Sequence, residues 1–282
     1  MTISDSYITH INILGFWSPA DVEMGKDCGR QNIWRKIMIR EEIVERYLDS
    51  LLRGDRRNSR LVIEETLQSG TPTNLVYMEV VWPTMVEIER LLRAERITLA
   101  QEHLATRISR TIVDQLQNKL PRRQARNKKI AVCCAPDELQ ELGGQIIADL
   151  FESDGWDVRF LGGGLTNDDI LTFVHEYSPD VLLVYGTSPR QAPSIRQLID
   201  RIKDVSANPN MQIMVSGGLF NRAEGLWQEI GADAFAATAE QALEMATGSI
   251  PVEQISRTIN RRKRKRMDMP AETQKADAKI VA

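Results

Sequence analysis

Small hydroxyl residues and glycines gather in short loops of the carboxyl-terminal half, and their chemistry suits ligand binding. Residues 187–188 read Thr-Ser and residues 216–218 read Ser-Gly-Gly, each just after a short apolar run. Hydroxyl groups donate and accept hydrogen bonds, and glycine lets a ligand approach the backbone closely. A triple glycine at 162–164 lacks the lysine and the Ser or Thr of a phosphate-binding loop. The pattern therefore indicates a ligand site of another kind.

The chain offers few groups for acid–base or metal chemistry. Its three histidines are His10, His103 and His175, and it has no Cys-x-x-Cys. No spacing predicts a Ser-His-acid arrangement, a metal cluster or a pair of catalytic carboxylates. We therefore expect a binding protein and not an enzyme. His103 follows Glu102 on an amphipathic segment, where a histidine is often just a hydrogen-bonded surface residue.

The composition is that of an ordinary globular chain. Its 282 residues allow one or two domains, and the net charge of -3 argues against a surface that coats nucleic acid. The three cysteines show no disulfide spacing, as is typical of a reducing cytosol. No run approaches the roughly 18 apolar residues that span a bilayer. We expect a cytoplasmic protein that does not enter a membrane.

The amino-terminal half carries a helical period. Apolar residues recur at three- and four-residue steps through about 38–53, 55–67, 73–93 and 98–116. Thr98 with a glutamine three residues later is a capping-box signature, and Pro83 should kink the third segment. Four helices joined by short turns predict a four-helix bundle.

From residue 130 the period changes. Five short apolar runs alternate with five helical segments. The runs are residues 130–134, 158–161, 181–185, 213–215 and 234–236, and the helical segments are about 138–154, 167–176, 193–204, 221–230 and 239–246. This alternation predicts an α/β fold, a flavodoxin-like (Rossmann-like) domain with a five-stranded, parallel, doubly wound sheet. Such sheets bind ligands at the carboxyl ends of their strands.

The domain organisation follows from these changes of pattern. We predict an N-terminal extension at 1–37, a helical cap bundle at 38–117, a basic linker at 118–129, a Rossmann domain at 130–248 and a basic, disordered tail at 249–282. The tail contains an unbroken basic run, Arg261, Arg262, Lys263, Arg264, Lys265 and Arg266. Such runs are commonly solvated, and the alternative is contact with DNA or an acidic partner.

Three stretches share their pattern with a known module. They are residues 51–92, residues 97–107 (ITLAQEHLATR), and residues 135–170 together with TSP at 187–189 and SGG at 216–218. They resemble the cobalamin (B12)-binding module with a helical cap bundle, which occurs in methionine synthase, in methyltransferase corrinoid proteins and in CarH-type light-sensing repressors. The resemblance implies a cobalamin between bundle and sheet; a haem or a bilin is the alternative tetrapyrrole.

The resemblance also implies which residues bind the cofactor. They are Trp82, Glu102 and His103 on the bundle, and Gln140, Gly143, Thr187, Ser188, Ser216, Gly217 and Gly218 on the sheet domain. In this family an Asp-x-His-x-x-Gly motif supplies a histidine that ligates cobalt from below after the nucleotide tail swings away. Here residues 138–143 read ELQELG, so Gln140 stands in place of that histidine. An amide is a much weaker cobalt ligand than an imidazole. The small residues at the strand ends would leave room for the buried tail, and the simplest local interpretation of Gln140 is a helix cap.

A cobalamin-type module without a DNA-binding domain resembles the PpaA/AerR-type antirepressors of photosynthesis genes. The resemblance implies a regulator that responds to ligand, light or redox state and modulates a partner transcription factor, a repressor, with DNA contact through the basic run at 261–266. Assembly into a homo-oligomer is compatible with this role. Two alternatives stay open: a corrinoid methyl carrier of a methyltransferase system, and a degenerate module that acts as an apo interaction protein. The last predicts a pocket filled by side chains.

Overall fold

The computed structural model describes residues 28–205 and 210–248, with side chains from residue 40 onward. Most of the predicted N-terminal extension and the whole predicted tail, including the basic run at 261–266, lie outside the described residues. The chain divides between Ile43 and Val44 into two compact units. All contacts discussed below lie within the second unit.

Four helical segments precede the sheet, as the sequence predicts. They are α1 (Cys28–Leu52), α2 (Arg56–Gln68), a continuous run made of α3 (Thr73–Val76), η4 (Tyr77–Val81) and α4 (Trp82–Arg93), and α5 (Leu99–Gln117). The apolar pattern of the first helix begins at residue 38, but the helix itself starts earlier, at Cys28. Arginine, glutamine and lysine are good helix formers, so the helix continues there without a regular apolar stripe.

Local chemistry explains two details of these helices. The capping box of α5 is confirmed: the Thr98 hydroxyl accepts from the Gln101 backbone N–H (3.2 Å), and the Gln101 side chain accepts from the Thr98 N–H (3.0 Å). Pro83 lies at the start of α4, directly after a turn of π-helix. Proline lacks a backbone N–H donor and crowds the preceding turn of a helix. The wider π-helical turn accommodates both effects.

Two buried tyrosines organise the packing of the helices. The Tyr47 hydroxyl lies 3.0 Å from the Ser109 hydroxyl on α5. The Tyr77 hydroxyl lies within hydrogen-bond distance of two acceptors, the Val113 carbonyl of α5 (2.9 Å) and Asp149 Oδ2 (3.0 Å). Asp149 belongs to α6 (Leu142–Ser153), so Tyr77 joins the bundle to the sheet domain.

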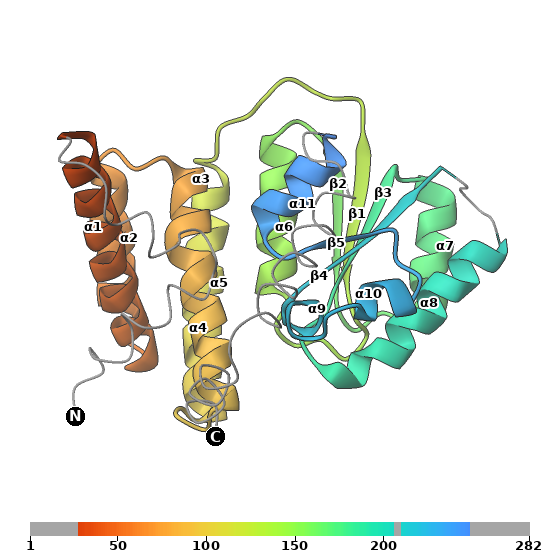
Figure 1. Cartoon of the computed structure of the whole chain (residues 1–282), viewed down its shortest axis with the longest axis horizontal. Coiled ribbons are helices and arrows are strands. Elements are labelled where there is room, and N and C mark those ends of the chain that lie inside the picture. The colour runs from red at the N-terminus through yellow and green to blue at the C-terminus, as the bar shows by residue number, and fades with distance from the viewer. Residues whose placement is uncertain (1–27, 206–209, 249–282) are drawn as a thin grey trace, which may run out of the picture. The chain divides into compact units, whose positions relative to one another are not determined.

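The carboxyl-terminal half is a five-stranded, fully parallel sheet in the order β2-β1-β3-β4-β5, which confirms the predicted fold class. The strands are β1 (Lys129–Cys134), β2 (Asp157–Gly162), β3 (Val181–Tyr185), β4 (Gln212–Ser216) and β5 (Ala234–Ala236). Helices α6 and α11 (Ala239–Ala246) cover one face of the sheet, and α7 (Asn167–Tyr177) and α8 (Ala192–Val205) cover the other (Figure 1).

Two helices differ from their predicted bounds. The helix expected at 138–154 starts only at Leu142, so residues 135–141 form a long loop after β1. The helix expected at 221–230 is two short helices, α9 (Gly218–Arg222) and α10 (Leu226–Glu229). Gly225 lies between them with φ +84°, a left-handed conformation that glycine adopts without strain and that interrupts a helix.

The basic linker is tied to the sheet domain. Arg123 and Arg126 pair with the buried carboxylate of Asp154, at 2.7 and 2.5 Å. The backbone N–H groups of the same two arginines donate to the carbonyls of Ser153 and Gly155. These positive charges are therefore partly neutralised within the chain.

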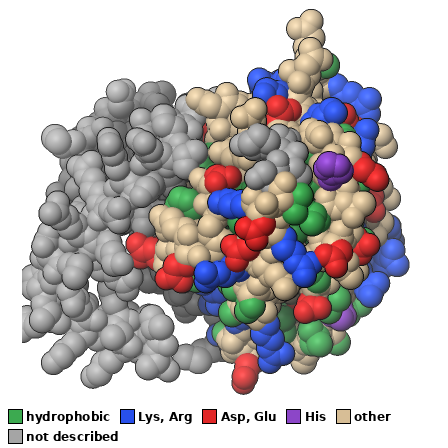
Figure 2. Space-filling model, turned by 90° about the vertical axis from the view of Figure 1, so that its right-hand side faces the viewer, with side chains coloured by type: hydrophobic (Ala, Val, Ile, Leu, Met, Phe, Trp, Pro, Cys, Tyr) green, Lys and Arg blue, Asp and Glu red, His purple; other side chains and the backbone are tan. Residues whose placement is uncertain are grey.

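The face around α7 and α8 mixes charges of both signs (Figure 2). Three of its ion pairs are Arg201–Asp168, Lys203–Asp233 and Arg196–Asp200. Across the described residues, no helix combines the length and the apolar character needed to cross a membrane.

Candidate functional site

The strand order reverses between β1 and β3, and the loops that follow these two strands lie side by side. In a doubly wound sheet this crevice is the expected ligand site. The loop after β1 holds Glu138 and Gln140, and the loop after β3 holds Thr187 and Ser188. The fold thus brings several of the predicted site residues to one end of the sheet.

Gln140 faces the bundle. Its side-chain Nε2 donates to Oε1 of Glu102, on α5, at 3.2 Å. Glu102 is only 3% exposed and also accepts from the Thr106 hydroxyl at 2.8 Å. His103 is exposed, with its Nε2 3.6 Å from Glu102 Oε2. The predicted trio of Glu102, His103 and Gln140 is therefore brought together, while the interpretation of Gln140 as a helix cap is wrong, because residue 141 is the N-cap and no side chain caps α6.

Glu138 joins the two loops, although it is not among the site residues predicted from the sequence. Glu138 is 5% exposed, and its carboxylate accepts from the Thr187 N–H (2.7 Å), the Thr187 hydroxyl (2.8 Å) and the Gln140 N–H (2.8 Å). Only its position, where the resembled motif has its aspartate, could have indicated this role.

Two further polar bridges run from the bundle to the loops. Arg110 of α5 donates to Glu141 at 2.7 Å, and Glu141 also accepts from the Gly163 N–H at 2.6 Å. Burial raises the pKa of Glu141, but these two hydrogen bonds and the positive charge of Arg110 together outweigh burial, and the net effect lowers its pKa. Arg222 pairs with Glu89 of α4 and donates to the Thr187 carbonyl.

The predicted strand-end glycines lie against other atoms of the chain. A Cβ placed on Gly143 would lie 2.2 Å from the Tyr185 hydroxyl. One placed on Gly217 would lie 2.3 Å from the Gly186 carbonyl oxygen, and one on Gly218 would lie 2.6 Å from the Arg222 guanidinium. The space that these glycines provide is therefore used for close packing within the protein.

The remaining predicted residues have local roles. Ser216 is buried and donates to the Ala236 carbonyl at 2.8 Å. Ser188 caps the short 3-10 helix at Pro189–Gln191. Trp82 begins α4 and is partly exposed, and within the described part of the chain no recorded hydrogen bond, ion pair or ring contact joins it to the other predicted residues.

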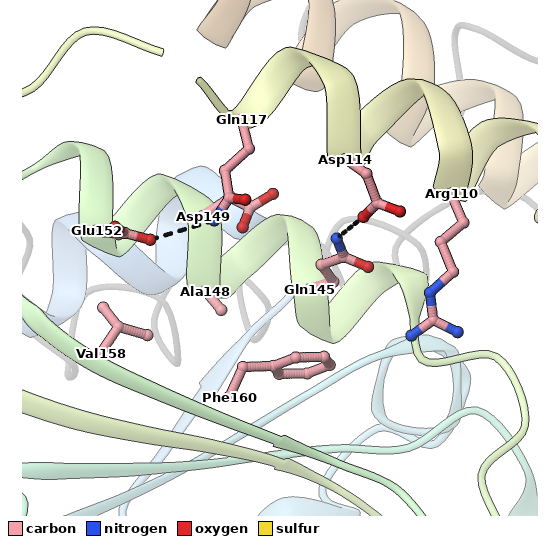
Figure 3. A pocket seen from close by; sticks show the side chains of 9 residues that line it. All are labelled: Arg110, Asp114, Gln117, Gln145, Ala148, Asp149, Glu152, Val158 and Phe160. Atoms are coloured by element: carbon pink, nitrogen blue, oxygen red, sulfur yellow. Dashed lines mark hydrogen bonds between the residues drawn. The ribbon is translucent and has the colours of Figure 1, made fainter. Parts of the chain in front are cut away.

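A pocket of about 340 Å³ lies elsewhere, between α5, α6 and β2 (Figure 3). Its lining contains none of the predicted site residues; it consists of Arg110, Asp114, Gln117, Gln145, Ala148, Asp149, Glu152, Val158 and Phe160. Hydrogen bonds from Gln145 to Asp114 (2.7 Å) and from Gln117 to Glu152 (3.3 Å) cross it. Burial raises the pKa of Asp149 to about 7.

Two protein-family models match the two parts of this fold. Both carry the description "B12 binding domain"; one matches residues 43–117, the helices, and the other residues 128–246, the sheet domain. Residues 43–117 and 128–246 of the chain thus belong to the two B12 binding domain families.

Individual relatives of this B12-family chain are corrinoid proteins. A corrinoid protein of Desulfitobacterium hafniense is 22% identical over 66% of this chain and 82% of its own length. Dimethylamine corrinoid protein 1 of Methanosarcina acetivorans is 21% identical over 57% of this chain and 76% of its own. The structure of the Methanosarcina barkeri monomethylamine corrinoid protein aligns with a TM-score of 0.67 and 17% identity, covering 74% of this chain and 99% of that protein. The structural match shows the shared fold, and the two B12 binding domain models support a cobalamin or corrinoid as the cofactor class.

The side chains of this B12-family chain fit part of a cobalamin and not all of it. Glu102, His103 and Gln140 offer polar groups that suit the amide rim of a corrin ring. Gln140 is a poor donor to cobalt, because an amide oxygen is a weak ligand. The spaces at Gly143 and Gly217 are filled by the chain itself. The residues therefore do not fit a nucleotide tail buried in the sheet domain with the metal held by a side chain.

Within the described residues, no three His, Cys, Asp or Glu side chains are grouped so that they could hold a free metal ion.

Proposed function

We propose that this chain binds a corrinoid ring between α5 and the carboxyl ends of β1 and β3, and serves as the corrinoid carrier of a methyl-transfer system. The observation that carries the proposal is the Glu102–Gln140 hydrogen bond. It joins Glu102, a bundle residue predicted to bind the cofactor, to Gln140, the residue at the ligand position of the motif. When bound, a corrinoid supplies a cobalt that accepts and releases a methyl group.

The chain's own residues would bind and orient the ring. Because Glu102 and Gln140 are only 3.2 Å apart, a ring can lie between them only after this hydrogen bond breaks. Ring amides would then replace it, which satisfies the buried Glu102 carboxylate again. In this proposal the chain has no catalytic residue, and a partner methyltransferase performs the reaction.

A second candidate is the ligand-responsive regulator, and the set of bridges to the bundle favours it. The hydrogen bonds Glu102–Gln140 and Arg110–Glu141 and the ion pair Arg222–Glu89 all join the bundle to the strand-end loops. A ligand that separates them would shift the population between two arrangements, which a partner transcription factor could recognise. The basic run at 261–266 would then contact that partner or DNA.

An absorption spectrum after desalting tests the proposed binding. The full chain is mixed in the dark with hydroxo-, methyl- or adenosylcobalamin, and separately with haem and biliverdin. We expect one corrinoid per chain to be retained, and Glu102→Ala to weaken retention about tenfold, which corresponds to about 1.4 kcal/mol. Glu176→Ala, at an exposed site on α7, is the matched control and should retain the wild-type amount.

Loss of every corrinoid on desalting, with the chain folded, would refute corrinoid binding and leave the apo interaction module. Neighbouring genes separate carrier from regulator: methyltransferase genes support the carrier, and pigment-synthesis genes support the regulator.

A further inference from the structure

Tyr185 fills the space beside the glycine that the resembled motif retains. It is the last residue of β3, and its ring lies against the first turn of α6. A Cβ on Gly143 would lie 2.2 Å from the Tyr185 hydroxyl oxygen, 2.4 Å from Cζ and 2.8 Å from Cε2. No side chain fits at Gly143 while the tyrosine ring is there. The glycine is therefore needed by the chain's own packing.

Two neighbouring glycines also lie close to other atoms of the chain. A Cβ on Gly144 would lie 3.1 Å from Cys134 Sγ at the end of β1. Gly217, after β4, has φ +105° and approaches the Gly186 carbonyl of the loop after β3. Because protein interiors are packed as densely as organic crystals, a group the size of a nucleotide base cannot enter here without moving the Tyr185 ring or the start of α6.

We propose that Tyr185 excludes the nucleotide tail of a corrinoid from the sheet domain, so that this chain selects its ligand by the corrin ring and accepts corrinoids that lack a nucleotide. The inference rests on the proposed corrinoid function. Gln140 agrees with it: an amide is a much weaker cobalt ligand than an imidazole, so a chain with glutamine at this position gains less from drawing the tail inside than a chain with the motif's histidine does. Both features, glutamine in place of the motif's histidine and Tyr185 in the tail space, are expected of a chain that binds a corrinoid with the nucleotide tail outside the sheet domain.

Competition between two corrinoids on the full-length chain tests the proposal. The probes are cyanocobalamin, which has the nucleotide, and dicyanocobinamide, which lacks it, measured by equilibrium dialysis. We expect the wild-type chain to bind both with dissociation constants within about threefold of each other. Tyr185→Phe keeps the ring and should keep this ratio. Tyr185→Ser opens the space and should shift the ratio at least tenfold toward cyanocobalamin.

A preference of the wild-type chain for cyanocobalamin of tenfold or more would overturn the proposal, and so would an unchanged ratio in folded Tyr185→Ser. Thermal melting monitors folding. If the serine variant does not fold, Tyr185→Val removes the ring with a side chain better suited to a strand end.

Failure of the proposed function can be distinguished from failure of this inference. If the wild-type chain retains neither corrinoid, the proposed function fails, and the double variant Gln140→His with Tyr185→Ser decides the role of Tyr185. Gain of cyanocobalamin binding without gain of dicyanocobinamide binding supports exclusion by Tyr185. Nitrogen-15 labelling of histidine, which changes the splitting in the cobalt(II) resonance spectrum, would verify the new ligand. A folded double variant that binds neither corrinoid overturns the inference.

Discussion

Replacing Asp149 by asparagine should make the protein more stable at alkaline pH. Asp149 is 5% exposed and lies 3.0 Å from the Tyr77 hydroxyl. Its pKa is about 7, against a usual 3.8, mainly because burial disfavours the carboxylate, with smaller contributions from the nearby charges of Glu152 and Asp114. The folded protein therefore holds this proton more tightly than the unfolded chain does.

The size of the effect follows from this shift of about three pH units. The stabilisation is fully present below about pH 3.8 and is lost as the pH rises through about 7. At roughly 1.4 kcal/mol for each unit, the free energy of unfolding falls by about 4 kcal/mol over that range. This is a large part of the 5–15 kcal/mol that typically stabilises a folded protein.

The asparagine side chain does not ionise, so it gains no charge as the pH rises, and its oxygen can still accept a hydrogen bond from the Tyr77 hydroxyl. We expect Asp149→Asn to exceed the wild type by about 4 kcal/mol at about pH 8 and by only about 1 kcal/mol at about pH 4.5. Urea unfolding followed by circular dichroism at both pH values measures this difference. Asp200→Asn, an exposed site on α8, is the control and should follow the wild-type curve. If Asp149→Asn shows the wild-type pH dependence, the assignment of the raised pKa to Asp149 is refuted.

Three further substitutions test the packing and the bridges. Gly143→Ala should lower the free energy of unfolding by about 1–3 kcal/mol, because the new Cβ meets the Tyr185 ring. Adding Tyr185→Ser should recover much of this loss in urea unfolding, and absence of recovery would contradict the proposed clash. Thr98→Ala removes the α5 cap and should cost about 1 kcal/mol in the same assay, and an unchanged midpoint would argue against the capping box. Arg222→Ala breaks the ion pair with Glu89, so amide hydrogen exchange in the loop after β3 should become faster, whereas equal rates would show that this bridge does not hold the loop.

Local signals in the sequence predict much of this fold. The runs that became β1 and β3 are continuous and apolar because both faces of a parallel sheet are covered, and this pattern does not depend on distant partners. The Thr98 capping box is equally local. The late start of α6 is different. Glu138 and Gln140 leave the helix to bond Thr187 and Glu102, partners 49 and 38 residues away, which no local propensity reveals.

The candidate site was only partly predictable for the same reason. The resemblance located Glu102, His103 and Gln140, and the structure brings them together. It also gave the glycines a role in making room for a ligand. That space is instead filled by Tyr185 and by the backbone of Gly186, because the residue that uses a glycine's space is determined by tertiary packing and not by the glycine's own neighbours in sequence.

The anchored linker determines how the bundle can swing. Residues 118–120 alone separate the end of α5 from the first hydrogen bond that ties the linker to the sheet domain, in which the Ser153 hydroxyl donates to the Pro121 carbonyl. This short hinge lies beside Gln117, whereas Glu102 lies about 22 Å away along the helix, at 1.5 Å for each residue. A rotation of about 10° at the hinge would thus displace Glu102 by about 4 Å while Gln117 hardly moves. In such a rotation the gap between α5 and the strand-end loops would open most widely at Glu102, where a flat ring would enter.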